Sequence, residues 1–114
     1  MDPNADAKKL MNQLDTQEKL ENILHRSSPK PLTIIYFTAK WCGPCKALNL
    51  AKVINSYKGI EWYVCDIDEN DYSGGYCGIK SIPSFLAIKN GKPVQPITQS
   101  NADKVVDWIS TLIK

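Results

Sequence analysis

The stretch TAKWCGPCK, residues 38–46, decides how the chain folds, because it separates two segments of different periodicity. Just upstream, residues 32–37 (LTIIYF) form an apolar run of β-branched and aromatic side chains, which predicts a buried strand. Downstream, residues 47–57 carry apolar side chains at helical spacing, which predicts a helix. Pro44 favours the first turn of this helix, since its missing N–H would have no partner there. The two cysteines of the stretch therefore lie where a central strand ends and a helix begins.

The position of these cysteines predicts reversible thiol chemistry. Cys42 falls at the helix cap, where unpaired N–H groups and the positive end of the helix dipole lower a cysteine's pKa and favour the reactive thiolate. Cys45 follows three residues later on the same helix face, at roughly 5–6 Å between Cβ atoms. A disulfide needs a Cβ separation of about 3.8 Å. The pair is therefore expected to open and close without refolding the chain.

A bare C-x-x-C also occurs in zinc sites and at haem attachment points. Lys46 follows Cys45, where haem attachment needs a histidine. A zinc site needs four ligands, and the remaining candidates, Cys65, Cys77 and His25, form no second C-x-x-C. We therefore expect a redox centre with no metal ion and no cofactor.

Three motifs in this order resemble the thioredoxin family. Residues 41–46 (WCGPCK) are similar to its active-site motif, residues 82–85 (IPSF) to its cis-proline segment and residues 89–91 (KNG) to its last hairpin turn. The resemblance leads us to expect an N-terminal extension over residues 1–12 and a thioredoxin domain over residues 13–114. It implies an α/β protein with the thioredoxin fold, in which a central mixed β-sheet is flanked by helices on both faces.

The resemblance also implies roles for single residues. The first cysteine attacks a substrate disulfide and forms a mixed disulfide, and the second resolves it and releases the reduced substrate. The tryptophan acts as a lid beside the nucleophile, the glycine allows a substrate to approach closely, and the residue before the cis-proline pairs with substrate backbone. The catalytic residues are thus expected to be Cys42 and Cys45, and the substrate-binding residues Trp41, Gly43, Pro44, Ile82 and Pro83.

These roles imply a thiol–disulfide oxidoreductase that reduces protein disulfides and is recharged by a thioredoxin-reductase-type electron donor. The Gly-Pro pair between the cysteines is typical of reducing members of the superfamily, and we expect a monomer. Two other classes stay open at this point. One is a binding or chaperone-like adaptor, and the other is a metal or iron–sulfur protein that shares Cys42 and Cys45 across a dimer.

Composition narrows the partners and the compartment. The net charge is +2, without a basic cluster interleaved with aromatic residues, so we expect no nucleic acid partner. No apolar run approaches the ~18 residues of a membrane span, and residues 1–20 lack the apolar core of a signal peptide. Four cysteines in such a chain are expected to be free or catalytic thiols. The cytoplasm is the expected compartment.

Before the motif, the chain is expected to contain one strand and one helix. Residues 1–12 are expected to form a mobile tail, with a short helix as the alternative, and residues 13–14 an edge strand. Residues 15–18 (DTQE) resemble a capping box, which predicts the start of a helix that ends near residues 27–29. This helix is expected to bury Leu20, Ile23 and Leu24 and to place a charged His25 near its C-terminus.

After the motif, residues 61–66 predict a second inner strand, parallel to the first. A solvated acidic loop (residues 66–71) and a short helix weakened by adjacent glycines (residues 72–79) should follow. Asn-Gly at residues 90–91 predicts an antiparallel hairpin, with a strand before it and a second strand at residues 94–97. A last helix is expected to be capped by residues 100–103 and to bury Val105, Val106, Trp108, Ile109 and Leu112.

Two positions depart from the family's pattern. Tyr36 stands where many thioredoxins have a buried aspartate, credited with taking the proton from the resolving thiol, and Val64 stands where a lysine often accompanies it. Tyrosine, with an ordinary pKa near 10, is a poor base at neutral pH. We therefore expect Cys45 to keep a higher pKa, and mixed disulfides to resolve more slowly than in a typical member.

Four other residues bear on specificity and regulation. Thr38 and Thr98 stand where bacterial members usually have a tryptophan and a glycine, and Thr98 is expected to narrow the docking surface. Cys65 is expected to pack as a small hydrophobic residue. Cys77 is expected to be a half-buried thiol without function, with regulatory oxidation as the alternative.

Overall fold

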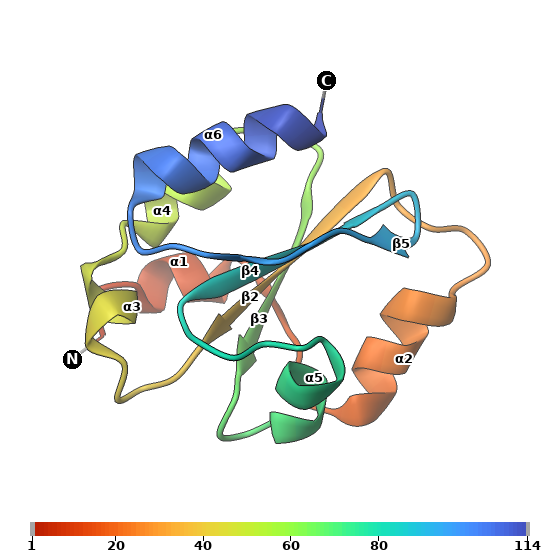
Figure 1. Cartoon of the computed structure of the whole chain (residues 1–114), viewed down its shortest axis with the longest axis horizontal. Coiled ribbons are helices and arrows are strands. Elements are labelled where there is room, and N and C mark those ends of the chain that lie inside the picture. Colours follow the sequence, from red (N-terminus) through yellow and green to blue (C-terminus); the bar gives the residue numbers. More distant parts are fainter. Residues whose placement is uncertain (1, 114) are drawn as a thin grey trace.

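The structure, a computed structural model, describes residues 2–113. Within them, six strands form one mixed sheet with helices on both faces (Figure 1). The strands are β1 (Asn12–Gln13), β2 (Leu32–Thr38), β3 (Glu61–Asp66), β4 (Ser84–Lys89), β5 (Lys92–Pro93) and β6 (Ile97–Thr98). The helices are α1 (Ala5–Lys9), α2 (Gln17–His25), α3 (Gly43–Ala47), α4 (Leu50–Ile54), α5 (Asp71–Tyr76) and α6 (Ala102–Leu112). The predicted α/β class and mixed sheet are confirmed.

The strand that precedes the cysteine motif lies in the middle of the sheet. The strand order is β1-β3-β2-β4-β5, and β6 also pairs with β4. β1, β3 and β2 are parallel, whereas β4 runs antiparallel to β2. All seven residues of β2 are buried. The expected inner strand at residues 61–66 and its parallel pairing are therefore confirmed.

Successive side chains of β2 point to opposite faces of the sheet, as pleating requires. Ile34 and Tyr36 belong to a core that includes residues of α1, α4 and α6. Ile35 and Phe37 belong to a second core, which includes residues of α2. Figure 1 shows the same division, with α1, α4 and α6 on one side of the sheet and α2 and α5 on the other. Because β2 is covered on both faces, packing fixes its position and the direction in which it leads into the cysteine motif.

The helix expected over residues 47–57 is wrong as a single element. α3 ends at Ala47 and α4 begins at Leu50, because Leu48 is extended (φ −68°, ψ 130°). Asn49 caps α4, with its side-chain oxygen accepting a hydrogen bond from Lys52 N at 3.2 Å. Asparagine is a strong N-cap residue, and apolar spacing alone does not reveal this interruption.

The expectation of a mobile tail before residue 13 is also wrong over the described residues. Residues 5–9 form α1, in keeping with the alternative of a short helix, and Ala7 and Met11 belong to the core beside α4 and α6. Asn4 is buried as well, with 7% of its surface exposed. The segment is therefore docked on the domain through apolar contacts.

Smaller differences concern element ends. The cap of α2 is Thr16, whose side chain accepts a hydrogen bond from Lys19 N at 3.2 Å, whereas the capping box at residues 15–18 begins with Asp15. The hairpin turn at Asn90 and Gly91 is confirmed, with φ values of 51° and 82°. The strand expected at residues 94–97 is replaced by the short β5 and β6, since Pro93 and Pro96 cannot donate ladder hydrogen bonds.

The last helix agrees with its prediction in position and in most of its buried face. Asn101 caps α6, and Val105, Ile109 and Leu112 are buried. Val106 and Trp108 are only partly buried, as is Leu24 in α2. Within residues 2–113, no helix has both the length and the apolar character needed to cross a lipid bilayer.

Candidate active site

Cys42 and Cys45 lie together at the N-terminus of α3, immediately beyond the central strand. Cys42 is the N-cap residue, and its Sγ accepts a hydrogen bond from Cys45 N at 3.2 Å. The two residues form a disulfide, with 5.3 Å between their Cα atoms. Pro44 occupies the first turn, as expected for a residue without an N–H. The strand end and the helix start thus bring both sulfur atoms together without any long-range contact.

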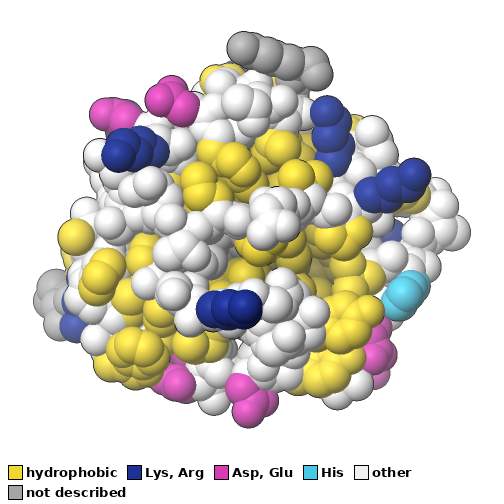
Figure 2. Space-filling view, in the orientation of Figure 1, with side chains coloured by type: hydrophobic (Ala, Val, Ile, Leu, Met, Phe, Trp, Pro, Cys, Tyr) yellow, Lys and Arg dark blue, Asp and Glu magenta, His cyan; other side chains and the backbone are white. Residues whose placement is uncertain are grey.

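An apolar groove runs along the outer side of Cys42. It has a volume of about 560 Å³, and five of the seven predicted site residues line it, namely Trp41, Cys42, Gly43, Pro44 and Ile82. Ile67 and Ile79 add apolar surface. Figure 2 shows hydrophobic side chains gathered on this face, from the loop before α3 to the surroundings of α5. The groove therefore offers an extended partner an apolar surface that passes the sulfur of Cys42.

Gly43 leaves the groove open beside the nucleophile. A Cβ atom added to Gly43 would meet no other atom within 4 Å. Packing inside the domain therefore does not require a glycine here. The free space lies on the side from which a partner would approach, in keeping with the role that the sequence suggests for this residue.

The predicted cis-proline segment lies against the disulfide. The Ile82–Pro83 peptide bond is cis, and Pro83 is buried. The carbonyl oxygen of Ile82 is 3.8 Å from the Sγ of Cys42. All seven predicted site residues are therefore brought to one place, from segments 40 residues apart in the chain.

Trp41 is held by a residue that the sequence did not point out. Its side chain is 66% exposed, yet its indole N–H donates a hydrogen bond of 2.8 Å to the Asp68 carboxylate. Asp68 belongs to the acidic loop that we expected to be merely solvated. Nothing in the sequence signals this contact, because the two residues are 27 positions apart and only the fold brings them together.

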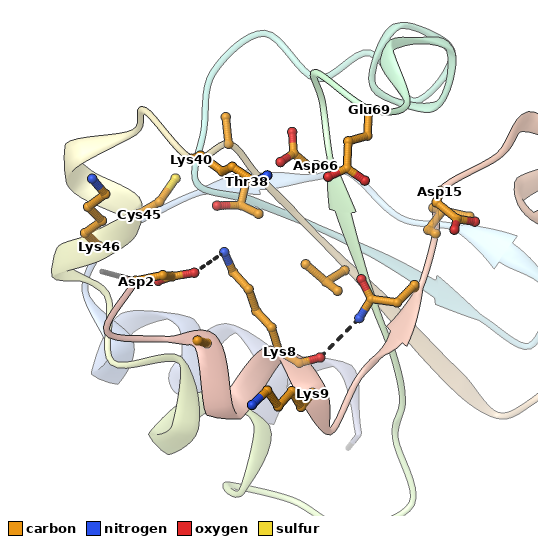
Figure 3. A pocket seen from close by; sticks show the side chains of 15 residues that line it. Asp2, Lys8, Lys9, Asp15, Thr38, Lys40, Cys45, Lys46, Asp66 and Glu69 are labelled. Atoms are coloured by element: carbon orange, nitrogen blue, oxygen red, sulfur yellow. Dashed lines mark hydrogen bonds and ion pairs between the residues drawn. The ribbon is translucent and has the colours of Figure 1, made fainter.

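A second cavity lies behind Cys45 and shares no lining residue with the groove. It has a volume of about 510 Å³, and Thr38, Cys45 and Val64 are among the residues that line it (Figure 3). Tyr36 is fully buried, and burial raises the pKa of its phenol; the Thr38 side chain opposes this rise and the Asp2 carboxylate adds to it. At neutral pH Tyr36 is therefore a neutral phenol with almost no phenolate available as a base, in keeping with the poor base that the sequence led us to expect.

The other two cysteines are separate from this centre. Cys65 is fully buried, and burial raises its pKa to about 12. Cys77 is half-buried, and burial raises its pKa to about 11. Both are thiols at neutral pH, in keeping with a packing role for Cys65 and against a reactive regulatory role for Cys77.

Two further expectations concern metal binding and Thr98. Within residues 2–113, His, Cys, Asp and Glu side chains form no group of three or more that could hold a metal ion. Thr98 lies in β6, with its hydroxyl 2.7 Å from that of Ser84. A narrowing of the docking surface by Thr98 stays a prediction.

Comparison with known proteins agrees with this geometry. The family model described as Thioredoxin matches residues 11–111. Thioredoxin from Gallus gallus is 28% identical over 90 residues, which cover 77% of this chain and 86% of that protein. The solved structure of oxidised mitochondrial thioredoxin 3 from Saccharomyces cerevisiae has a TM-score of 0.81 and 25% identity, with 92% and 98% of the two chains covered. For the reduced Schistosoma mansoni thioredoxin pre-protein the TM-score is 0.76 and the identity 30%, with 90% and 97% covered. The chain therefore belongs to the thioredoxin family, and it is a thiol–disulfide oxidoreductase that reduces protein disulfides through a reversible Cys42–Cys45 disulfide.

Proposed function

We propose that this chain is a monomeric cytoplasmic reductant, recharged by a thioredoxin-reductase-type electron donor. In its working cycle the Cys42 thiolate attacks a protein disulfide, and Cys45 then displaces the reduced substrate. Trp41, Gly43, Pro44 and the cis-proline pair of Ile82 and Pro83 hold the substrate segment in the groove during both steps.

The observation that carries this proposal is the different surroundings of the two sulfur atoms. Cys42 borders the apolar groove, whereas Cys45 borders the cavity behind it. A protein substrate in the groove thus meets Cys42 first, and Cys45 is left to act from inside. This asymmetry suits an attacking and a resolving thiol, and an adaptor that only binds partners would not need it.

An insulin-reduction assay with dithiothreitol tests the reaction. We expect the wild type to accelerate insulin precipitation and Cys42→Ser to lose this activity, because serine cannot form the mixed disulfide. Cys77→Ser serves as the matched control and should keep full activity, since Cys77 lies outside the groove. Binding of insulin without reduction by the wild type would favour the adaptor class instead.

Direction, donor and location need separate measurements. Equilibration of the dithiol with glutathione should place the couple on the reducing side of the glutathione couple. NADPH consumption with a thioredoxin reductase tests the donor. Sedimentation tests the monomer, and localisation of the tagged chain in its cell tests the cytoplasm. An oxidising couple would contradict the role as a reductant.

A further inference from the structure

The resolving step needs a proton acceptor near Cys45. An ordinary cysteine has a pKa of about 8.5, so at neutral pH the thiol must lose a proton before it attacks. Tyr36, a fully buried residue of β2, cannot serve as that acceptor at neutral pH, because burial raises the pKa of its phenol and keeps it protonated. The candidates are therefore the ionisable groups that line the cavity behind Cys45.

The N-terminal segment is attached to the same helix turn that carries Cys45. The Asn4 side-chain N–H donates to the carbonyl oxygen of Cys45 at 3.0 Å, and Leu50 N donates to the Asn4 side-chain oxygen at 3.3 Å. These two backbone groups face the interruption between α3 and α4, where helical hydrogen bonds are missing. Asn4 bridges the interruption, and this contact sets where the residues before it lie.

Two residues of this segment bring an ion pair into the cavity behind Cys45. Lys8 Nζ lies 2.6 Å from the Asp2 carboxylate, which also accepts a hydrogen bond from Asn4 N at 2.9 Å. Their side chains are 22% and 33% exposed, so the pair is partly shielded and still reaches solvent. Figure 3 shows Asp2 and Lys8 pointing toward each other inside this cavity, which Cys45 also lines.

Two buried hydroxyl groups lie near the cavity, which is large enough to hold water. The hydroxyls of Tyr36 and Thr38, on one face of β2, interact with each other, but neither forms a hydrogen bond of good geometry with the described residues. Buried hydroxyls are normally satisfied by protein or by ordered water. Thr38 lines the cavity, which has room for several water molecules, and the Asp2 charge is close enough to affect Tyr36. Water there would connect Cys45 with Asp2.

We propose that the Asp2 carboxylate, held behind Cys45 by Asn4 and Lys8, accepts the proton of the Cys45 thiol through water when the mixed disulfide is resolved. The proposal rests on the dithiol cycle of the proposed function. The electron pair left on Cys45 attacks the Sγ of Cys42, the Cys42–Cys45 bond forms, and the bond from Cys42 to the substrate sulfur breaks. The substrate sulfur leaves with the electron pair of the broken bond and takes a proton from solvent. The dithiol is thereby oxidised by two electrons and the substrate disulfide reduced.

The charges around Asp2 suit a transient acceptor. Burial raises its pKa, but hydrogen bonds from Lys8 and Asn4 outweigh burial, so the pKa lies below its ordinary value. Asp2 is thus ionised before the step and passes the proton on to solvent. Lys8 meanwhile offsets negative charge near the new thiolate. The other ionisable side chains that line the cavity, besides the Cys45 thiol, are Lys9, Asp15, Lys40, Lys46, Asp66 and Glu69.

Single-turnover reaction with one equivalent of 5,5′-dithiobis(2-nitrobenzoate) separates the two steps. Attack by Cys42 releases the first thionitrobenzoate and attack by Cys45 the second. We expect Asp2→Asn to slow the second phase about tenfold near neutral pH, with the difference fading above about pH 9, where hydroxide removes the proton. The first phase should not change. Asparagine keeps the acceptor for Asn4 N, so the segment should stay docked.

Asp6→Asn is the matched control, because Asp6 lies four residues from Asp2, in α1, with a fully exposed side chain. It should behave as the wild type, and Asp2→Glu should restore most of the second phase. An unchanged second phase in Asp2→Asn, or an equal slowing of both phases at every pH, would overturn the proposal. Release of no thionitrobenzoate by the wild type would contradict the dithiol function itself, and the proposal with it. If the proposal holds, the slow resolution that the sequence led us to expect from Tyr36 should be seen in the Asp2→Asn variant and not in the wild type.

Discussion

The surroundings of the sulfur atoms divide the four cysteines of the chain into two kinds. Cys42 and Cys45 are buried in the disulfide form, but they border open cavities and sit at a helix N-terminus. Cys65 and Cys77 lie among apolar side chains of the other core. Desolvation disfavours the thiolate there, so reactivity at these positions is set by surroundings and not by residue type.

We expect Cys77 to react slowly with iodoacetamide at neutral pH. Its pKa of about 11 leaves roughly three-hundredfold less thiolate than an ordinary cysteine with a pKa of about 8.5 has, because the thiolate fraction falls tenfold for each pKa unit. The rate should rise about tenfold per pH unit below the pKa. Peptide mapping after timed alkylation of the reduced protein measures it, with the guanidinium-unfolded chain as control. Equal rates in the folded and unfolded chain would contradict the prediction.

Among the elements, the β4–β5 hairpin depends on a single glycine for two reasons. Gly91 has a φ of 82°, which side chains rarely adopt, and a Cβ there would lie 3.0 Å from Pro29. The turn is thus packed against the segment that leads into β2. Its glycine is required by backbone conformation and by close approach together.

Gly91→Ala should lower the free energy of unfolding by about 2–3 kcal/mol, the sum of the left-handed conformation and the overlap with Pro29. Gly59→Ala is the control, because Gly59 has the same φ of 82° but no atom within 4 Å of the added Cβ. It should cost only about 1 kcal/mol. Urea unfolding of the two variants gives the comparison. Equal losses would show that the contact with Pro29 relaxes freely.

At the scale of the whole molecule, two polar contacts connect distant segments. Arg26, at the end of α2, contacts both carboxylate oxygens of Glu61 in β3 and the hydroxyl of Thr33 in β2. Asn4 attaches the N-terminal segment to the active-site helix. Both contacts are largely shielded from solvent. Loss of a hydrogen bond costs most in such places, because water cannot replace the missing partner.

Glu61→Gln should destabilise the protein by about 1–2 kcal/mol at neutral pH. The hydrogen bond from Arg26 outweighs burial and holds the pKa of Glu61 below its ordinary value. This stability is therefore fully present above the unfolded-state pKa and is lost as pH falls through the lower folded-state pKa. Urea unfolding from neutral to acidic pH should show the two proteins converging at the acidic end. Glu69→Gln, at an exposed position, should not show this convergence.

Asn4→Ala should cost about 1–2 kcal/mol, because it leaves the Cys45 carbonyl without its partner and removes one of the two acceptors of the Leu50 N–H, which also donates to the Leu48 carbonyl oxygen at 3.1 Å. Amide exchange at Leu50 should accelerate in the variant. Asn22→Ala, at an exposed position, should change stability by no more than about 0.5 kcal/mol. An unchanged exchange rate at Leu50 would mean that Asn4 does not hold the helix turn.

Most of the fold and the centre of the active site could be predicted from local patterns. The central strand, the cysteine turn and the hairpin at Asn90 and Gly91 each follow from a few neighbouring residues. The predictions failed where a local cap competed with periodicity, as at Asn49, and where docking of a short segment depended on distant partners. Ala7 is an ordinary small residue in the sequence and gives no sign that it is buried against α4 and α6.

The sequence by itself determined that a strand would deliver two thiols to a helix N-terminus, since strand period, proline position and cysteine spacing act within a few residues. Only the tertiary structure decided what surrounds the second thiol. Asn4 meets Cys45 across 41 positions, and Asp2 and Lys8 reach the same cavity only because α1 packs beside α4. Such contacts arise from the mutual packing of elements, for which no periodicity or spacing along the chain is a signal.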